Sequence, residues 1–151
     1  MKIKKKIAIL GSTGSIGKSL LKIIKKNKKN FVIMLLTANT NYLELLRQTK
    51  TFDVKNVIIS DTKCYQKFKK INKNKNLKIY NNYNCFNLIF KKKIDYTMSA
   101  IVGIEGLGPT LKIIKHSKKI AIANKESIIC GWNLLEKEIK KFKAIFVPVD
   151  S

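Results

Sequence analysis

The stretch Gly11-Ser12-Thr13-Gly14-Ser15-Ile16-Gly17 decides how this chain folds. It follows the apolar run 7–10 and precedes a repeat of apolar residues at helical spacing, Ile16, Leu20, Ile23 and Ile24. Glycines permit a tight turn and a close approach of the backbone to a pyrophosphate, and the next helix offers its free N–H groups to phosphate. The spacing is Gly-x-x-Gly-x-x-Gly instead of the commoner Gly-x-Gly-x-x-Gly, and a plain structural turn is the alternative. The flanking strand and helix favour nucleotide binding.

Apolar runs and amphipathic helical patterns alternate along the rest of the chain, without a repeat or a linker. We expect strands at 6–10, 31–36, 57–59, 77–80, 95–99, 120–123 and 144–147. Helices are expected at 15–26, around 42–46, after Ser60 or Asp61, within 81–93, from 107 onward and after Asn124. This alternation predicts one doubly wound α/β domain with a mostly parallel, Rossmann-like sheet over residues 1–151.

Ligands of such a sheet bind beyond the carboxyl ends of the strands. The segments predicted there are rich in glycine and polar residues: 11–17, 37–41, 99–103, 124–126 and 148–151. They are therefore expected to converge on one edge of the sheet and to form the ligand site.

The formal net charge of +23 suggests nucleic acid as a partner. Two features argue against a specific nucleic-acid role. Arg47 is the single arginine of the chain. Proteins that recognise bases or phosphates favour arginine, because its guanidinium group can donate two parallel hydrogen bonds to one partner. The lysines are scattered among many Asn and Ile residues, which share A/T-rich codons, so a biased genome accounts for the composition.

The three cysteines, Cys64, Cys85 and Cys130, form no Cys-x-x-Cys pair and are interpreted as reduced, mostly buried thiols. The chain has no run of 18 or more apolar residues, so no membrane span is predicted. The apolar run after the basic N-terminus is too short for a secretory signal, so a cytoplasmic location is expected.

The end of the second strand bears on the choice of cofactor. NAD-specific folds place an Asp or Glu there to hold the ribose 2′-hydroxyl, but the corresponding residues of this chain, 37–40, include no acid. In so basic a protein this favours a 2′-phosphate and hence NADP over NAD; an ordinary polar loop is the alternative. Asn41 is also a candidate helix N-cap.

Three further positions could carry chemistry. In Asn124-Lys125-Glu126, the lysine could meet an anionic substrate, although, taken alone, a capped helix start with solvated charges is the better explanation of these residues. Asp150 could hold a hard divalent cation, but one carboxylate is not a metal site. The lone His116 lies near a helix C-terminus and is expected at the surface.

Five stretches in this order and spacing resemble the 1-deoxy-D-xylulose 5-phosphate reductoisomerase family. They are the glycine stretch 11–17, Ser99-Ala100-Ile101-Val102-Gly103, Gly106-Leu107 with Pro109-Thr110, Ala123-Asn124-Lys125-Glu126-Ser127, and Pro148-Val149-Asp150-Ser151. The resemblance covers the whole chain. It implies isomerisation and reduction of 1-deoxy-D-xylulose 5-phosphate by NADPH to 2-C-methyl-D-erythritol 4-phosphate in non-mevalonate isoprenoid biosynthesis, with Mg²⁺, Mn²⁺ or Co²⁺. It also implies a homodimer for full-length members.

The same resemblance implies roles for individual residues. NADPH would contact Thr13, Gly14, Ser15, Ile16, Asn39, Thr40, Asn41, Asn124 and Glu126. Lys125 and Ser151 would bind the phosphorylated sugar, and Asp150 the metal.

Two departures from the family pattern stand out. The family usually has Gly-Lys-Asn after the second strand, where this chain has Asn39-Thr40-Asn41, so part of the expected contact with the 2′-phosphate is missing. The family also continues past Ser151 with a Glu, a catalytic domain and a helical C-terminal domain. The resemblance therefore predicts that these residues are the cofactor domain of the enzyme, inactive alone. A nucleotide-binding remnant without turnover is the alternative.

Overall fold

The computed structural model describes residues 2–149 and places them in one seven-stranded parallel sheet covered by helices. The strands are β1 (Lys5–Leu10), β2 (Phe31–Ala38), β3 (Asn56–Ile59), β4 (Lys78–Tyr80), β5 (Ile94–Ser99), β6 (Ser117–Ile122) and β7 (Ile145–Pro148), in the spatial order β4-β3-β2-β1-β5-β6-β7. The expected Rossmann-like α/β fold is confirmed.

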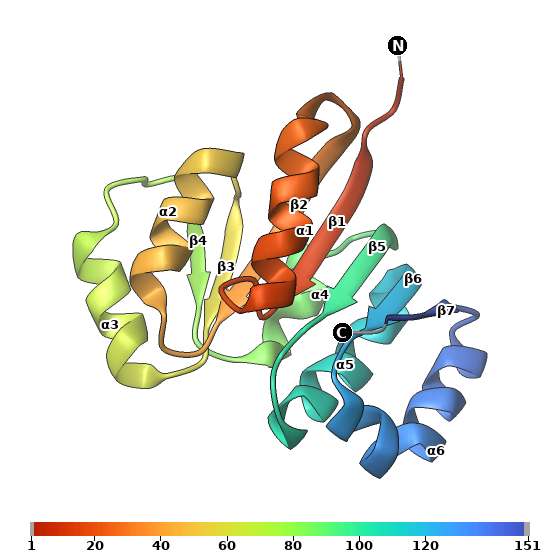
Figure 1. The fold of residues 1–151 in the computed structure, drawn as a ribbon. Helices are drawn as coiled ribbons and strands as arrows, with labels where there is room; N and C mark the ends of the chain where they lie inside the picture. The colour runs from red at the N-terminus through yellow and green to blue at the C-terminus, as the bar shows by residue number, and fades with distance from the viewer. Residues whose placement is uncertain (1, 150–151) are drawn as a thin grey trace.

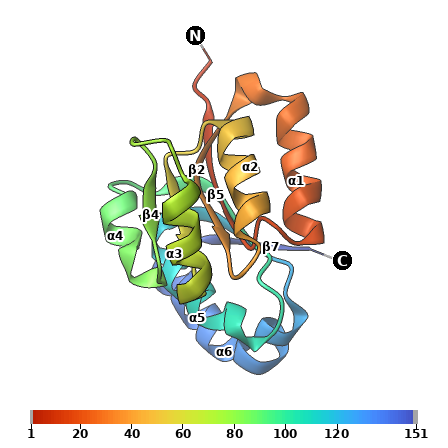
Figure 2. The same cartoon turned by 90° about the vertical axis from the view of Figure 1, so that its left-hand side faces the viewer.

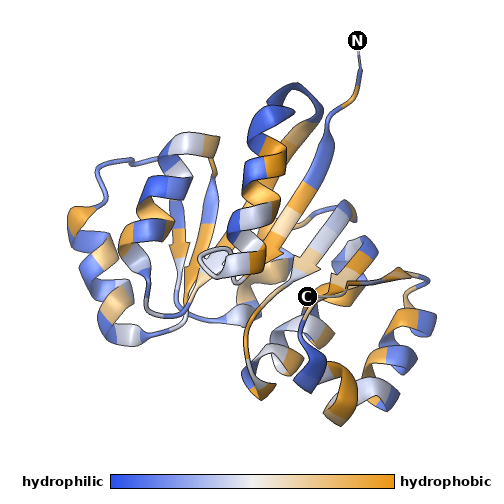
Figure 3. Cartoon of the chain, in the orientation of Figure 1, coloured by the Kyte–Doolittle hydropathy of each residue, from blue (hydrophilic) through white to orange (hydrophobic). Residues whose placement is uncertain are grey.

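The α-helices are α1 (Ser15–Lys26), α2 (Tyr42–Phe52), α3 (Thr62–Ile71), α4 (Phe86–Ile89), α5 (Leu107–Ile113) and α6 (Lys125–Lys141). Short 3₁₀ turns are η1 (Lys28–Asn30), η2 (Tyr83–Cys85), η3 (Ile104–Gly106) and η4 (Ile114–His116). Apolar and hydrophilic residues alternate along the helices (Figure 3), and the buried residues of α1 and α6 recur at helical spacing: Gly17, Leu21 and Ile24, and Ser127, Gly131, Leu135 and Ile139.

Two apolar layers hold the helices to the sheet. On one face, Ile9 and Leu36 pack with residues of α1, α2 and α3, among them the fully buried Phe68. On the other face, Leu10 and Ile120 pack with residues of α4, α5 and α6. Figure 2 shows α1 and α2 on one side of the sheet and α4 on the other. Adjacent residues such as Ile9 and Leu10 thus fill opposite layers, because successive side chains of a strand alternate between faces.

From β1 the sheet continues through β2, β3 and β4 in one direction, and from β5 it continues through β6 and β7 in the other. This reversal between β1 and β5 fixes the place of the site. The chain leaves β1 into α1 on one face and leaves β5 toward α5 on the other. In Figure 1 the loop after β1 therefore lies beside the segment that follows β5, at the carboxyl edge of the sheet. Such a reversal is where open α/β sheets bind their ligands.

Some sequence-based boundaries were wrong. Strand β2 runs on through Thr37 and Ala38, which were expected in a loop, and β6 begins at Ser117 instead of Ile120. The helix expected over 81–93 is only η2 followed by the four-residue α4. Here Asn side chains compete with helical hydrogen bonds: Asn82 Oδ1 accepts from Asn84 N, and Asn81 Nδ2 donates to Ile59 O.

The cysteines are all free thiols, and only Cys85 is fully buried; Cys64 is half-buried and Cys130 is exposed. Burial raises the pKa of Cys85 to about 11, so its thiol stays protonated. No helix among residues 2–149 is long and apolar enough to cross a membrane.

His116 does not lie at the surface as expected; it is buried against aromatic rings. Its ring centroid is 5.5 Å from that of Phe90 and 6.1 Å from that of Phe86, and its Nε2 atom is buried without a hydrogen-bond partner in residues 2–149. Burial lowers the pKa of His116, and Lys115 lowers it further.

This environment predicts a pH-dependent stability. The pKa of His116 in the folded chain lies below its unfolded value of about 6.5. As the pH falls, the unfolded chain therefore binds a proton at this histidine before the folded chain does. The folded state loses stability as the pH falls below about 6.5. His116→Phe fits the aromatic cluster and cannot titrate. Urea unfolding from about pH 7.5 to about pH 5 should show a smaller loss of stability for His116→Phe than for the wild type. Parallel pH profiles for the two proteins would contradict this.

Candidate cofactor site

The loop between β1 and α1 depends on three glycines in different ways. Gly11 has φ +78°, and a Cβ there would lie 2.7 Å from Ala100 O. A Cβ at Gly17 would lie 2.6 Å from Gly11 O. At Gly14 the nearest atom in residues 2–149 would be Gly11 O, at 3.7 Å. Gly11 and Gly17 therefore let backbone segments pack together, whereas the Cβ side of Gly14 has no close neighbour among the described residues.

The start of α1 differs from the starts of the other long helices. Asn41 Oδ1 caps α2 by accepting from Glu44 N, and Asp61 Oδ1 caps α3 by accepting from Cys64 N. Asn124 Oδ1 caps α6 in the same way. The N-cap of α1 is Gly14, which has no side chain to offer, and the first turn of α1 holds no acidic residue. The N–H groups of this turn thus remain available to an anion.

A cleft of about 680 Å³ opens beside this helix start. Of the predicted cofactor residues, Thr13, Gly14 and Asn39 line it. Its other walls come from the ends of neighbouring strands and from the segment after β5: Gly11, Thr37, Ala38, Ser60, Tyr83, Ala100, Ile101, Val102, Glu105 and Pro109. The cleft spans the carboxyl ends of β1, β2, β3 and β5. The sequence predicted the ends of β1, β2 and β5 at the ligand edge but not the end of β3.

A smaller hollow of about 210 Å³ adjoins the cleft and shares residues 100–102 with it. Ile16, Asn124, Lys125 and Glu126 line this hollow, together with Ala123. Lys125 and Glu126 are exposed at the start of α6. The structure thus brings the glycine loop and the Asn-Lys-Glu segment to two sides of one continuous depression.

Asn124 caps α6, as the sequence predicted, and has a second role that the sequence did not reveal. Its Nδ2 donates to Ile101 O at 2.6 Å and also to Gly103 O, while its Oδ1 accepts from Ser127 N at 3.2 Å. The buried carboxamide therefore caps α6 and holds the segment after β5 in place. Its predicted contact with NADPH stays a prediction, and it would have to use the remaining acceptor capacity of Oδ1 or backbone atoms.

The residues after β2 present amides and a hydroxyl at the rim of the cleft. Asn39 and Thr40 are exposed, and Asn39 Oδ1 accepts from Ser60 Oγ at 3.0 Å. The carboxylate of Asp61 follows at the end of β3, but its Oδ1 accepts from Cys64 N at 2.8 Å. That hydrogen bond lowers the pKa of Asp61 and keeps the charge on the start of α3.

Asp150 and Ser151, predicted for metal and substrate, lie outside the described residues. Within residues 2–149, no group of three or more His, Cys, Asp or Glu side chains could hold a metal ion. Ser15 begins α1, and Thr40 and Asn41 lead into α2, but none of these three lines either hollow.

A family model described as 1-deoxy-D-xylulose 5-phosphate reductoisomerase matches residues 7–131. The chain belongs to this family. It is 60% identical over 149 residues to the reductoisomerase of Pelagibacter ubique and 38% identical over 148 residues to that of Wolbachia pipientis wMel. Each alignment covers 97% of this chain but only 38% of the relative, so the chain spans well under half the length of these reductoisomerases.

Solved structures agree with this assignment. A reductoisomerase from Zymomonas mobilis in complex with NADPH matches 99% of this chain and 39% of its own, with a TM-score of 0.89 and 31% identity. A reductoisomerase in complex with magnesium matches 99% of this chain and 38% of its own, with a TM-score of 0.88 and 32% identity. Homoserine dehydrogenase from S. aureus, at 20% identity and a TM-score of 0.55, shares the fold alone.

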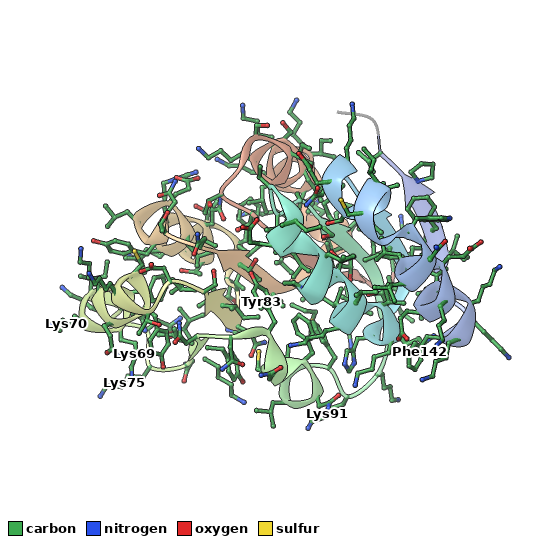
Figure 4. The ribbon with its side chains drawn as sticks, turned by 90° about the horizontal axis from the view of Figure 1, so that it is seen from below. Lys69, Lys70, Lys75, Tyr83, Lys91 and Phe142 are labelled. Atoms are coloured by element: carbon green, nitrogen blue, oxygen red, sulfur yellow. The ribbon has the colours of Figure 1, made fainter. Side chains whose placement is uncertain are left out.

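Sequence reasoning missed several residues of the reductoisomerase cleft. Tyr83 comes from η2, far along the chain, yet its hydroxyl lies 3.5 Å from Thr37 Oγ1. Figure 4 shows Tyr83 near the middle of the molecule as seen from below. Burial raises the pKa of Tyr83, so it presents a neutral phenol. The Asn-rich composition of 81–87 hid it, and no local pattern marks a residue that only the tertiary fold brings to the cleft.

Because Gly17 and Gly14 have different surroundings, replacing each with alanine should lower the free energy of unfolding by different amounts. Gly17→Ala forces a Cβ against Gly11 O and should destabilise the fold by about 1–3 kcal/mol. Gly14→Ala meets no close atom in residues 2–149 and should change stability by no more than about 0.5 kcal/mol. Urea unfolding of the two variants beside the wild type measures both; equal losses would show that the loop packs differently.

Proposed function

We propose that this chain binds NADPH and forms the cofactor-binding part of a 1-deoxy-D-xylulose 5-phosphate reductoisomerase. That enzyme rearranges 1-deoxy-D-xylulose 5-phosphate and reduces it to 2-C-methyl-D-erythritol 4-phosphate. The observation that carries the proposal is the start of α1: an uncapped helix whose N-cap glycine has open space on its Cβ side, at the reversal of strand order. The Zymomonas mobilis relative, solved with NADPH, supports it.

The residues present fit the cofactor. The backbone of Thr13, Gly14, Ser15 and Ile16 would hold the pyrophosphate, since the first turn of α1 offers N–H donors and the positive end of its dipole. Asn39, which lines the cleft, would hold the adenosine ribose and its 2′-phosphate together with Thr40 and Asn41, which follow it in the chain. Asn124 and Glu126 would contact the cofactor from the smaller hollow. When bound, NADPH would supply the hydride that reduces the rearranged sugar.

Lys125 and Ser151 would bind the phosphorylated sugar, and Asp150 would supply one oxygen to Mg²⁺, Mn²⁺ or Co²⁺. Lys125 lines the smaller hollow, and its ammonium group would attract an anionic substrate bound beside the cofactor. A reductoisomerase solved with magnesium supports the choice of metal. Further metal and substrate ligands would come from the part of the reductoisomerase that this chain does not span.

The proposal includes no specific nucleic-acid partner. The lysines are spread over the molecule, and Figure 4 shows Lys69, Lys70, Lys75 and Lys91 at its periphery. Among residues 2–149, few lysines have an acidic partner, so the surface charge would strengthen binding of any anion at low salt. We propose the cytoplasm as the compartment and a homodimer as the state of the whole enzyme.

The first test is cofactor binding by the chain itself. Titration should show binding of NADPH that is tighter than binding of NADH, because amides, hydroxyls and a basic surface follow β2 where an acid would select NAD. Gly14→Val should weaken NADPH binding more than about tenfold, because its side chain would fill the space beside the helix start. Equal or tighter binding of NADH would refute the argument for a 2′-phosphate.

The second test concerns the metal. A chimera in which this chain replaces the matching 38% of the Pelagibacter ubique reductoisomerase should convert substrate with NADPH and Mn²⁺. In that chimera Asp150→Ala should abolish metal-dependent turnover and leave the affinity for NADPH unchanged, because the carboxylate would ligate the metal and not the cofactor. An inactive chimera would favour the nucleotide-binding remnant, and an active Asp150→Ala chimera would remove Asp150 from the metal site.

A further inference from the structure

Gln48, on α2, holds one residue of the glycine loop with both ends of its carboxamide. Its Oε1 accepts from Ser12 Oγ at 2.7 Å, and its Nε2 donates to Ser12 O at 3.0 Å. The Gln48 side chain is 1% exposed, and Ser12 is fully buried. Two hydrogen bonds in a buried setting fix Ser12 more firmly than one would, because each lost bond leaves an unsatisfied polar group.

The bond to Ser12 O also sets the direction of the next N–H group. In a trans peptide the C=O and the N–H point to opposite sides, and the chain has no cis peptide in residues 2–149. Since Ser12 O is directed at Gln48, the N–H of Thr13 must point away from α2. No acceptor for Thr13 N–H occurs within the described residues, and Thr13 lines the 680 Å³ cleft.

A charged pair determines which way the Gln48 amide faces. Nε2 also donates to Glu44 Oε1 at 3.2 Å, and Glu44 is held by Arg47 through Nε and Nη2, at 2.9 and 2.5 Å. Arg47 lowers the pKa of Glu44, so this acceptor keeps its charge. Ser12 O and Glu44 Oε1 both accept from the NH₂ group of Gln48. Flipping the amide would put its oxygen against these two acceptors and break both hydrogen bonds.

We propose that Gln48 is a positioning residue for the cofactor: by holding the Ser12–Thr13 peptide, it aims Thr13 N–H at the pyrophosphate of NADPH. The inference rests on the proposed NADPH function. It also gives α2 two tasks, because the helix starts at the loop 39–41 proposed for the adenosine ribose and reaches the pyrophosphate loop about two turns later. A purely structural buried glutamine would stabilise the fold without regard to the phosphate.

Substitutions can separate the two roles. Gln48→Glu keeps the acceptor for Ser12 Oγ but places an oxygen against Ser12 O and Glu44. The double variant Gln48→Glu with Glu44→Gln removes the like-charge contact with Glu44, yet it still lacks a donor to Ser12 O. Gln48→Met removes both bonds at similar volume. The matched control is Ser117→Ala, which breaks the buried pair of Thr97 Oγ1 and Ser117 Oγ, 2.7 Å apart, at the start of β6 and away from the loop.

The measurement compares two ligands in the folded chain, with urea unfolding run in parallel. NADPH contains the pyrophosphate, and adenosine 2′-monophosphate does not. The double variant and Gln48→Met should bind NADPH about tenfold more weakly, the loss of about one charge-assisted hydrogen bond, and adenosine 2′-monophosphate within about twofold of the wild type. Ser117→Ala should lose stability with both affinities unchanged.

The outcomes distinguish the inference from the function on which it rests. If the wild type fails to bind NADPH, the proposed function is refuted before Gln48 is tested. If the wild type binds but Gln48→Met and the double variant bind NADPH as tightly, Gln48 does not position the loop. If both ligands weaken in parallel, Gln48 acts on the fold alone and the inference is wrong.

Discussion

The site depends on how closely the backbone after β1 packs between its neighbours. Gly11 passes so near Ala100, and Gly17 so near Gly11, that neither position has room for a Cβ atom. Thr37 fixes the loop from the side of β2: its Oγ1 accepts from Gly11 N and its carbonyl from Ser12 N, both at 2.9 Å. The ends of β1, β2 and β5 and the start of α1 are thus held together. The first turn of α1 lies at the edge of the sheet, and its N-cap glycine has no side chain to cover it. The proposed contacts with the pyrophosphate follow from that placement.

The segments around the cleft are held to one another mainly by buried polar side chains. Gln48 connects α2 to the glycine loop, and Asn124 connects α6 to the segment after β5. Ser99 Oγ lies 2.6 Å from Thr110 Oγ1, which joins the end of β5 to α5. Apolar packing alone is weakly directional, whereas these hydrogen bonds specify orientation and are costly to leave unmade. The core therefore fixes which elements pack together, and the polar groups fix how the loops of the cleft are aimed.

Much of this arrangement could be predicted from local sequence. The continuous apolar runs predicted the buried parallel strands, and the glycine spacing predicted the turn from β1 into α1. The predictions were wrong where contacts between residues far apart in the sequence determine the structure. Thr37 was expected in a loop but extends β2, because it pairs with Ile58 and binds Gly11. His116 was expected at the surface, since nothing nearby in sequence announces the rings of Phe86 and Phe90. Gln48 and Tyr83 carry no motif at all, and only the tertiary fold brings Gln48 to the glycine loop and Tyr83 to the cleft.

The uncapped start of α1 is a local weakness that the fold tolerates. A side-chain cap is worth about 1 kcal/mol, and α2, α3 and α6 each have one. A Ser or Asp at position 14 would supply a cap, but its side chain would stand where the phosphate is proposed to bind. The anion itself would then satisfy the N–H groups, so cofactor binding and helix capping are one interaction, made only when the ligand is present. If the proposal is right, the helix start that would meet the phosphate lacks the side-chain cap of α2, α3 and α6 because the stability given up in the free protein would become affinity in the complex.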